Sequence, residues 1–271
     1  MGGNYMEITM LGTGNALVTE CYNTCFVLHE GAESFLVDGG GGNGVLSQLK
    51  RAGLDWKDMR TIFVTHKHVD HILGIVWMVR MICQNMKRGT YEGEANLYGH
   101  AEVLQMAHDI ACMVLQPKEA AYMGDRLHFI TVENGETREI IGHDVTFFDI
   151  GSTKAKQFGF SMDLGNGKKL TCCGDEPYNP CEEPYAKGSK WMLHEAFCLY
   201  RDADHFKPYE KHHSTVKDAC KLAQTLGVEN LILYHTEDKT IEHRKELYMA
   251  EGKPYFDGNL FVPEDLEGFE L

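Results

Sequence analysis

No run of about 18 apolar residues, the length that a helix needs to cross a bilayer, occurs in the 271-residue sequence. The start of the chain, residues 1–5, lacks the basic and apolar segments of a signal peptide. A Cys-x-x-Cys motif is also missing, and the nine cysteines are odd in number. We therefore expect a cytoplasmic protein with reduced, buried thiols and no membrane partner.

Positive charge is scarce. The chain carries 26 Lys and Arg residues against 40 Asp and Glu residues, a formal net charge of −14. This balance argues against a broad basic surface for nucleic acid, although a local basic groove or a metal-centred phosphate site stays open. The apolar and charged fractions, 43% and 24%, are those of an ordinary soluble globular protein.

The stretch Thr61–His71 is the most informative in the chain. It begins as a short β-branched, apolar run, which predicts a buried strand, and ends in three histidines and one aspartate. A buried helix is predicted to follow from Ile72 to Val79. A single histidine would be interpreted as structural, but four polar side chains in one turn are costly to bury without a common partner. Imidazole and carboxylate are ligands of zinc and similar divalent metals, so this turn predicts a metal site.

Other short apolar strands also end in polar residues, namely Asp38, Asp175, Glu195 and His235. Strands alternate with helices at both ends of the chain, and the middle is rich in hairpins such as the one at Asn166-Gly167. Pro117 is expected to end a helix over 101–116, and Ser214 to cap a helix that ends before Gly227. No linker is apparent. We therefore expect one domain over residues 1–271, with two mixed sheets enclosed by helices and the site at one sheet edge.

The motif His66-x-His68-x-Asp70-His71, followed by strand-end Asp175 and His235, resembles the metallo-β-lactamase superfamily. The likeness spans nearly the whole chain. Within the superfamily, the segments 11–14, 193–197 and 213–215 resemble the ribonuclease Z branch. The resemblance implies an α/β (α+β) fold, a four-layer αββα sandwich of two mixed β-sheets flanked by helices. It also implies two divalent metal ions, usually zinc, at the sheet edges, with manganese and iron as alternatives for the same ligands.

Carried over by motif, the resemblance implies a ligand set in which His66 and His68 bind the first metal. The second metal would be bound by Asp70, His71 and His235, and Asp175 would bridge the two metals. A water held between the metals would be the nucleophile, oriented or deprotonated by Asp70.

The resemblance also implies that His213 donates a proton to the leaving group and that Glu195 orients His213. The structural alternatives are that His213 is only a residue near a helix start and that Glu195 is a solvated strand-end charge.

One departure from the family concerns the first metal. A further histidine is expected before the Phe158–Phe160 segment, but Ile150–Lys154 contains none, and His143 lies too early. The first metal would then be weakly held, supported by water, Ser152 or Thr153, or absent. Lys154 and Lys156 are interpreted as surface residues, with contact to an anionic group near the metal as the alternative.

A second departure concerns the substrate. Between Gly142 and Asp175 the chain lacks the glycine-rich, basic arm with which the branch clamps tRNA. Together with the acidic balance, this favours a small anionic substrate over tRNA.

The leading hypothesis is a metal-dependent hydrolase of a phosphodiester. The alternatives are an ester, lactone or thioester hydrolase and a degenerate metal-binding member without turnover. His68 argues against the diiron oxidoreductase branch, where a glutamate is usual. The branch also makes a homodimer an expectation.

Overall fold

The computed structural model describes residues 5–271, and the chain divides into two compact units. Unit 1 comprises Met1–Gly12, Tyr22–Glu133 and Leu266–Leu271, and unit 2 comprises Thr13–Cys21 and Asn134–Asp265. Residues 1–4, part of the start that lacks a signal-peptide pattern, lie outside the described residues. The single domain expected over residues 1–271 stays a prediction.

Unit 1 contains one seven-stranded mixed sheet with the strand order β14-β1-β2-β3-β4-β5-β6. Neighbours from β14 to β3 are antiparallel, whereas those from β3 to β6 are parallel. The elements of this unit are β1 (Glu7–Gly12), β2 (Cys25–Glu30), β3 (Glu33–Val37), α1 (Gly44–Arg51), η1 (Trp56–Asp58), β4 (Thr61–Phe63), α2 (Val69–Arg88), β5 (Ala95–Gly99), α3 (Ala101–Val114), α4 (Pro117–Ala120), β6 (Leu127–Thr131) and β14 (Gly268–Glu270).

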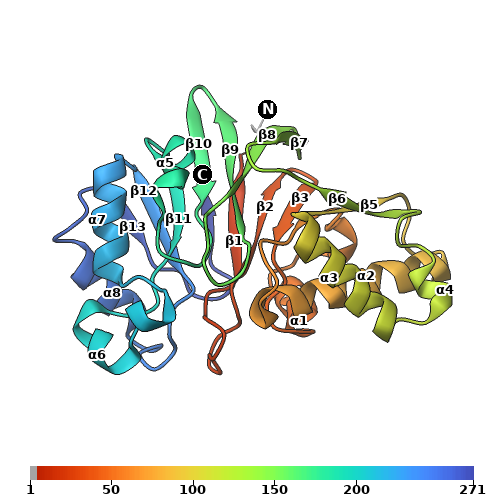
Figure 1. Cartoon of the computed structure of the whole chain (residues 1–271), viewed down its shortest axis with the longest axis horizontal. Helices are drawn as coiled ribbons and strands as arrows, with labels where there is room; N and C mark the ends of the chain where they lie inside the picture. Colours follow the sequence, from red (N-terminus) through yellow and green to blue (C-terminus); the bar gives the residue numbers. More distant parts are fainter. Residues whose placement is uncertain (1–4) are drawn as a thin grey trace. The chain divides into compact units, whose positions relative to one another are not determined.

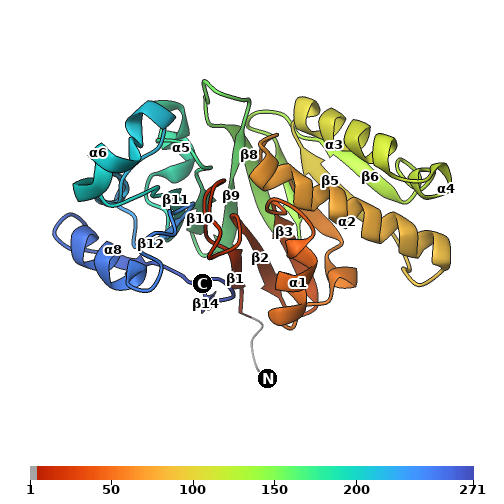
Figure 2. The ribbon, with the colours of Figure 1, turned by 90° about the horizontal axis from the view of Figure 1, so that it is seen from below.

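Apolar side chains of the strands and of α1, α2 and α3 form the core of unit 1. Leu36, Ile62 and Leu97 enter it from the sheet, and Ile75 and Val79 enter it from α2. Figures 1 and 2 show α2 and α3 side by side on one face of the sheet. This packing holds the start of α2 at the carboxyl ends of the parallel strands.

Two boundaries in unit 1 differ from the expectation. The helix predicted from Ile72 begins at Val69, so Asp70 and His71 lie in the first turn of α2 rather than in the preceding loop. Pro117 was expected only as a helix stop, but α3 ends at Val114 and Pro117 is the first residue of α4. Proline suits that position because its missing N–H would have no partner within the helix.

Unit 2 contains the second seven-stranded mixed sheet, with the order β13-β12-β11-β10-β9-β8-β7. Here β10 to β13 are parallel and β7 to β10 antiparallel. The elements of this unit are β7 (Thr137–Ile140), β8 (His143–Asp149), β9 (Phe158–Gly165), β10 (Lys168–Cys172), η2 (Pro180–Glu182), α5 (Glu183–Ala186), β11 (Trp191–Glu195), η3 (Tyr200–Asp202), α6 (Ala203–Phe206), η4 (Tyr209–Lys211), α7 (Val216–Leu226), β12 (Asn230–Tyr234), α8 (Arg244–Gly252) and β13 (Asn259–Phe261).

Helices α7 and α8 pack on each other and against the β11–β13 part of this sheet, as Figure 1 shows in blue. The predicted Asn166-Gly167 hairpin is confirmed, since both residues have positive φ, 54° and 72°. The predicted Ser214 cap is wrong by one residue. Thr215 caps α7 and forms a capping box with Asp218, which satisfies two N–H groups at the helix start.

In each sheet the carboxyl ends of the parallel strands carry the polar residues that the sequence singles out. Asp38 and the 66–71 turn follow β3 and β4 in unit 1, and Asp175 and His235 follow β10 and β12 in unit 2. The expectation of two mixed sheets flanked by helices is therefore confirmed. None of the helices within residues 5–271 has both the length and the apolar character that crossing a bilayer requires.

Glu182 makes the stability of unit 2 depend on pH. Its side chain is fully buried and accepts from the Asn179 N–H at 2.7 Å, and burial raises its pKa from 4.5 to about 8. The folded state therefore keeps a proton that the unfolded chain releases above pH 4.5, so this stabilising contribution is lost as the pH rises from about 4.5 to about 8.

We expect Glu182→Gln, which stays neutral, to gain roughly 2–4 kcal/mol relative to the wild type between pH 5 and pH 8. Urea unfolding at both pH values measures this difference. Glu183→Gln is the control, because Glu183 is an exposed partner of Lys187. Equal pH dependence of Glu182→Gln and wild type would show that the Glu182 carboxyl is not the source.

Candidate metal centre

The turn between β4 and α2 brings its imidazoles together. The His66 ring centroid lies 4.5 Å from that of His68 and 4.2 Å from that of His71. The His66 Nε2 and His68 Nδ1 atoms are 2.8 Å apart, and His71 Nε2 lies 3.5 Å from a carboxylate oxygen of Asp70. His66, Asp70 and His71 are buried and His68 is partly exposed. Unit 1 therefore gathers all four of its predicted ligands.

Asp38 and Thr65 orient these imidazoles from behind. Asp38 accepts hydrogen bonds from the Thr65 N–H and Oγ1–H, both at 2.8 Å, and its Oδ2 lies 2.7 Å from His71 Nδ1. Thr65 Oγ1 is in turn 2.9 Å from His66 Nδ1. Because the Nδ1 atoms of His66 and His71 meet hydrogen-bonding partners, their Nε2 atoms are the ones suited to a metal.

A close backbone contact fixes the start of α2. Gly39 N–H donates to the His71 carbonyl at 3.1 Å, and Gly74 N–H donates to the Gly40 carbonyl at 2.9 Å. A Cβ on Gly74 would lie only 1.7 Å from the Gly39 oxygen, so glycine is required there. The Tyr22 hydroxyl donates to the Gly39 and Gly42 carbonyls at 2.8 and 2.9 Å, which holds residues 39–42, the glycine loop, against α2.

The donor set of this turn fits a divalent metal. It combines imidazole nitrogens with a carboxylate, and a carboxylate behind His71 is the usual second partner of a metal-binding histidine. The left-handed backbone at Asp38, with φ of 57°, is unusual for a residue other than glycine and is consistent with a constrained functional position.

We expect Asp38→Asn to lower zinc affinity by roughly 10–100-fold, because Asn cannot supply the charge behind His71. Asn also tolerates a left-handed φ, so the backbone should be kept. Competition titration with a chromophoric zinc chelator measures the affinity. Asp55→Asn is the control, since Asp55 caps η1 elsewhere in unit 1. Unchanged zinc affinity in Asp38→Asn would contradict the assigned role.

Unit 2 places Asp175 and His235 together. Asp175 Oδ2 lies 3.4 Å from His235 Nε2, and both side chains are buried. Gly174, with φ of 78°, makes the turn before Asp175, and the Tyr234 hydroxyl donates to its carbonyl. Burial raises the pKa of Tyr234 well above its usual range, so this hydroxyl stays a neutral donor. His235, like Asp38, has a left-handed backbone with φ of 57°.

His213 and Glu195 also lie together in unit 2. The His213 ring stacks on Phe197, with centroids 4.8 Å apart, and its centroid is 5.1 Å from that of His235. His213 Nδ1 lies 3.6 Å from Glu195 Oε2, and the Ser214 N–H donates to Glu195 Oε1. Glu195 is fully buried at the end of β11, so the alternative of a solvated charge is wrong.

The loop between β8 and β9 contains no histidine, as the sequence indicates. The sequence did not predict the contacts that this loop makes with Glu176. Ser152 Oγ donates to Glu176 at 2.7 Å, and Lys154 Nζ lies 3.7 Å from the same Oε1 atom. Lys156 instead lies over the Phe158 ring at 5.2 Å. The sequence did not predict four supporting residues, namely Thr65, Glu176, Phe197 and Tyr234. The signal that they share is that each stands within two residues of a singled-out position.

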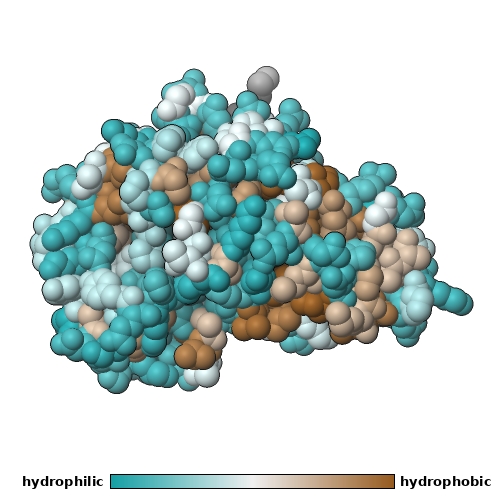
Figure 3. Space-filling model, in the orientation of Figure 1, coloured by the Kyte–Doolittle hydropathy of each residue, from teal (hydrophilic) through white to brown (hydrophobic). Residues whose placement is uncertain are grey.

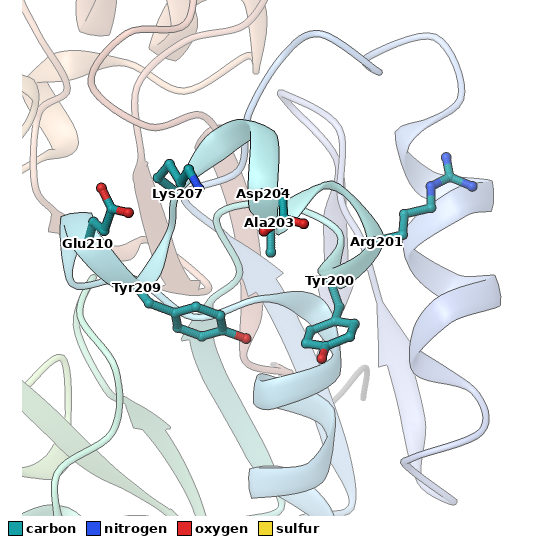
Figure 4. A pocket seen from close by; sticks show the side chains of 7 residues that line it. All are labelled: Tyr200, Arg201, Ala203, Asp204, Lys207, Tyr209 and Glu210. Carbon is teal, nitrogen blue, oxygen red and sulfur yellow. The ribbon is translucent and has the colours of Figure 1, made fainter.

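A hollow of about 420 Å³ lies in the segment of unit 2 that precedes His213. Figure 4 shows the rings of Tyr200 and Tyr209 along one side of it, with the Arg201 guanidinium extending away. The Tyr209 hydroxyl donates to Asp218 at 2.8 Å, and Lys217 Nζ lies 3.6 Å from the Tyr200 ring centroid. Both tyrosines are therefore held by the first turn of α7.

Comparisons with known proteins agree with this fold. Ribonuclease Z of Haloferax volcanii is 23% identical over 308 residues, which cover 98% of this chain and 95% of the relative. The metallo-β-lactamase fold protein YhfI from Bacillus subtilis has a TM-score of 0.79 at 17% identity and covers 99% of this chain and 100% of its own. Zn²⁺-bound PqqB from Methylobacterium extorquens has a TM-score of 0.74 at 12% identity, with 98% and 100% covered.

The chain thus has the metallo-β-lactamase fold, as the resemblance implied, and its curated relatives include ribonuclease Z. A family model described as anti-Pycsar protein Apyc1 matches residues 6–251, which is a finer assignment than the motifs alone provided. Because this match covers most of the 271 residues, the chain belongs to the anti-Pycsar protein Apyc1 family.

Proposed function

We propose that this protein is a metal-dependent phosphodiesterase. The observation that carries the proposal is the turn after β4, where imidazoles with hydrogen-bonded Nδ1 atoms lie beside a buried carboxylate. Such donors bind divalent cations that activate water for hydrolysis. Support also comes from the ribonuclease Z relatives, whose name denotes cleavage of a phosphodiester.

We further propose that the ligand groups of both units serve one centre for two cations. In this assignment His66 and His68 would hold the first cation, Asp70, His71 and His235 would hold the second, and Asp175 would be a ligand of both. The support is the order of these residues along the chain, which is that of the resembled superfamily. Zinc is proposed, with manganese or iron as alternatives, and the first site is weaker because its third histidine is missing.

When bound, divalent cations lower the pKa of a water molecule and polarise the phosphate oxygens. Asp70 would orient the attacking water through a carboxylate oxygen, in addition to binding metal. His213 would donate a proton to the leaving oxygen, and its ring is already held by stacking on Phe197. Glu195, whose Oε2 atom lies 3.6 Å from His213 Nδ1, would keep the imidazole oriented.

The proposed substrate is a small anionic phosphodiester rather than tRNA. Residues 143–175 form β8, β9, β10 and short connections, without a basic arm, and the net charge is −14. The family name describes a role against Pycsar, and we extend that role to this chain as part of the proposal. We also propose a cytoplasmic location, which is supported by buried cysteines that form no disulfide among residues 5–271, such as Cys173 and Cys220.

A substrate panel tests the proposed function. Zinc-loaded wild-type protein would be offered bis(4-nitrophenyl) phosphate, a 3′,5′-cyclic mononucleotide, a precursor tRNA and a 4-nitrophenyl carboxyl ester. We expect hydrolysis of a small phosphodiester that chelation abolishes and zinc restores. Hydrolysis of the carboxyl ester alone would favour the esterase alternative, and metal binding without turnover of any compound would favour the degenerate one.

A homodimer is a separate proposal. Figure 3 shows hydrophobic surface in the region of the unit 1 helices, where Val69, Met113 and Val114 are exposed on α2 and α3. Such a patch is suited to association of two copies. Sedimentation equilibrium of the wild type tests this, and a monomer at all concentrations would refute it.

A further inference from the structure

Lys154 lies in the loop where the resemblance leads one to expect a histidine, and it contacts two other segments of unit 2. Its Nζ lies 3.7 Å from Glu176 Oε1 and donates to the Lys211 carbonyl at 2.9 Å. Glu176 directly follows Asp175, and Lys211 stands two residues before His213. A single ammonium group therefore connects the Asp175 turn with the segment that presents His213.

Burial and two polar partners fix the Glu176 side chain at this contact. The Glu176 side chain is only 7% exposed, so its negative charge needs polar partners. Ser152 Oγ and Lys154 Nζ both contact its Oε1 atom. Ser152 Oγ also accepts from the N–H groups of Lys154 and Ala155, at 3.2 and 3.3 Å, which shapes the loop around Lys154. The Lys154 side chain is itself 27% exposed.

The segment that precedes His213 depends on contacts with other parts of unit 2 to keep its conformation. The segment before His213 is irregular and contains the short helices α6 and η4. The residues that follow these helices, Lys207 and His212, have a left-handed backbone with φ of 52° and 55°. Such backbone persists only where surrounding contacts hold it. Tyr209 anchors this segment to α7 through Asp218, and the Lys154 ammonium anchors it to the Asp175 turn.

We propose that Lys154 is a positioning residue that holds the His213 segment against the Asp175 turn. The kinetic consequence rests on the proposed function, in which His213 protonates the leaving group. Lys154 neither binds metal nor contacts substrate in this proposal. It acts through the Lys211 carbonyl and Glu176.

A leaving-group comparison tests the kinetic consequence. Lys154→Met would be compared with the wild type on two phosphodiesters, one releasing 4-nitrophenolate and one releasing an unactivated alkoxide. We expect kcat for the alkoxide to fall by about 10–100-fold, because only this leaving group needs the proton, and kcat for 4-nitrophenolate to change by less than about 3-fold. Lys154→Arg, which keeps the charge and the donors, should recover most of the alkoxide rate.

Lys156→Met is the matched control, because Lys156 is in the same loop but lies over Phe158. Thermal unfolding and zinc content of every variant exclude a folding or loading defect. Equal losses for both leaving groups, or full alkoxide activity in Lys154→Met, would overturn the positioning role.

Amide hydrogen exchange tests the contact between Lys154 and the Lys211 carbonyl independently of enzymatic activity. We expect the amides of residues 211–214 to exchange about 10-fold faster in Lys154→Met and at the wild-type rate in Lys156→Met. Unchanged exchange in Lys154→Met would overturn the proposal. A wild type that hydrolyses no phosphodiester would overturn the proposed function instead, and faster exchange in Lys154→Met would still support the contact.

Discussion

Asp70→Asn is expected to lower kcat/KM for a phosphodiester by roughly 10³–10⁵-fold while the protein remains folded. Asn has nearly the shape of Asp but cannot supply a negative charge to a cation or hold the attacking water as a base. The fold should tolerate the change, because Asp70 lies in the first turn of α2, where loss of the favourable charge costs only about 0.3–1 kcal/mol.

Steady-state kinetics with a small phosphodiester, together with zinc content and thermal unfolding, measure this effect. Glu102→Gln is the control, because Glu102 is an exposed carboxylate in an ion pair with Lys67. A loss of less than 10-fold in Asp70→Asn would remove Asp70 from the proposed machinery.

Gly74→Ala is expected to destabilise the protein by about 2–3 kcal/mol, although the position is helical. In an ordinary helix this substitution stabilises by about 1 kcal/mol, because alanine has the higher helix propensity. Here the added Cβ would lie 1.7 Å from the Gly39 oxygen, which is a backbone atom and cannot rotate away as a side chain could. The start of α2 must therefore move away from the glycine loop, and His71 moves with it.

Urea unfolding at constant m-value measures the loss, and a zinc titration reports the displacement of His71. Gly42→Ala is the control, since nothing lies within 4 Å of its added Cβ. Wild-type stability in Gly74→Ala would show that the contact relaxes without cost.

Much of the fold could be predicted because the deciding signals are local. The Asn-Gly dipeptide predicts the turn at Asn166-Gly167, and short apolar runs predict the strands. The structure confirms both. Helix boundaries were harder to predict where two neighbouring residues could both cap the helix. Thr215 rather than Ser214 caps α7 because Asp218, three residues later, completes its capping box.

The ligand-type residues of the candidate site could also be predicted, but not the groups that hold them. Asp38 was singled out as a strand-end residue, yet its contacts with Thr65 and His71 cross 27 and 33 positions of sequence. The contact of Lys154 with Lys211 crosses 57 positions. No local pattern encodes such distances, because they depend on which strands become neighbours in the sheet.

Anomalous scattering at the zinc edge, from a crystal of the zinc-loaded protein, tests the proposal that the ligand groups of both units serve one two-cation centre. We expect two peaks. One should lie within bonding distance of His66, His68 and Asp175, at the lower occupancy, and the other within bonding distance of Asp70, His71, Asp175 and His235. A peak held by residues of one unit alone, or no peak at these residues, would contradict it.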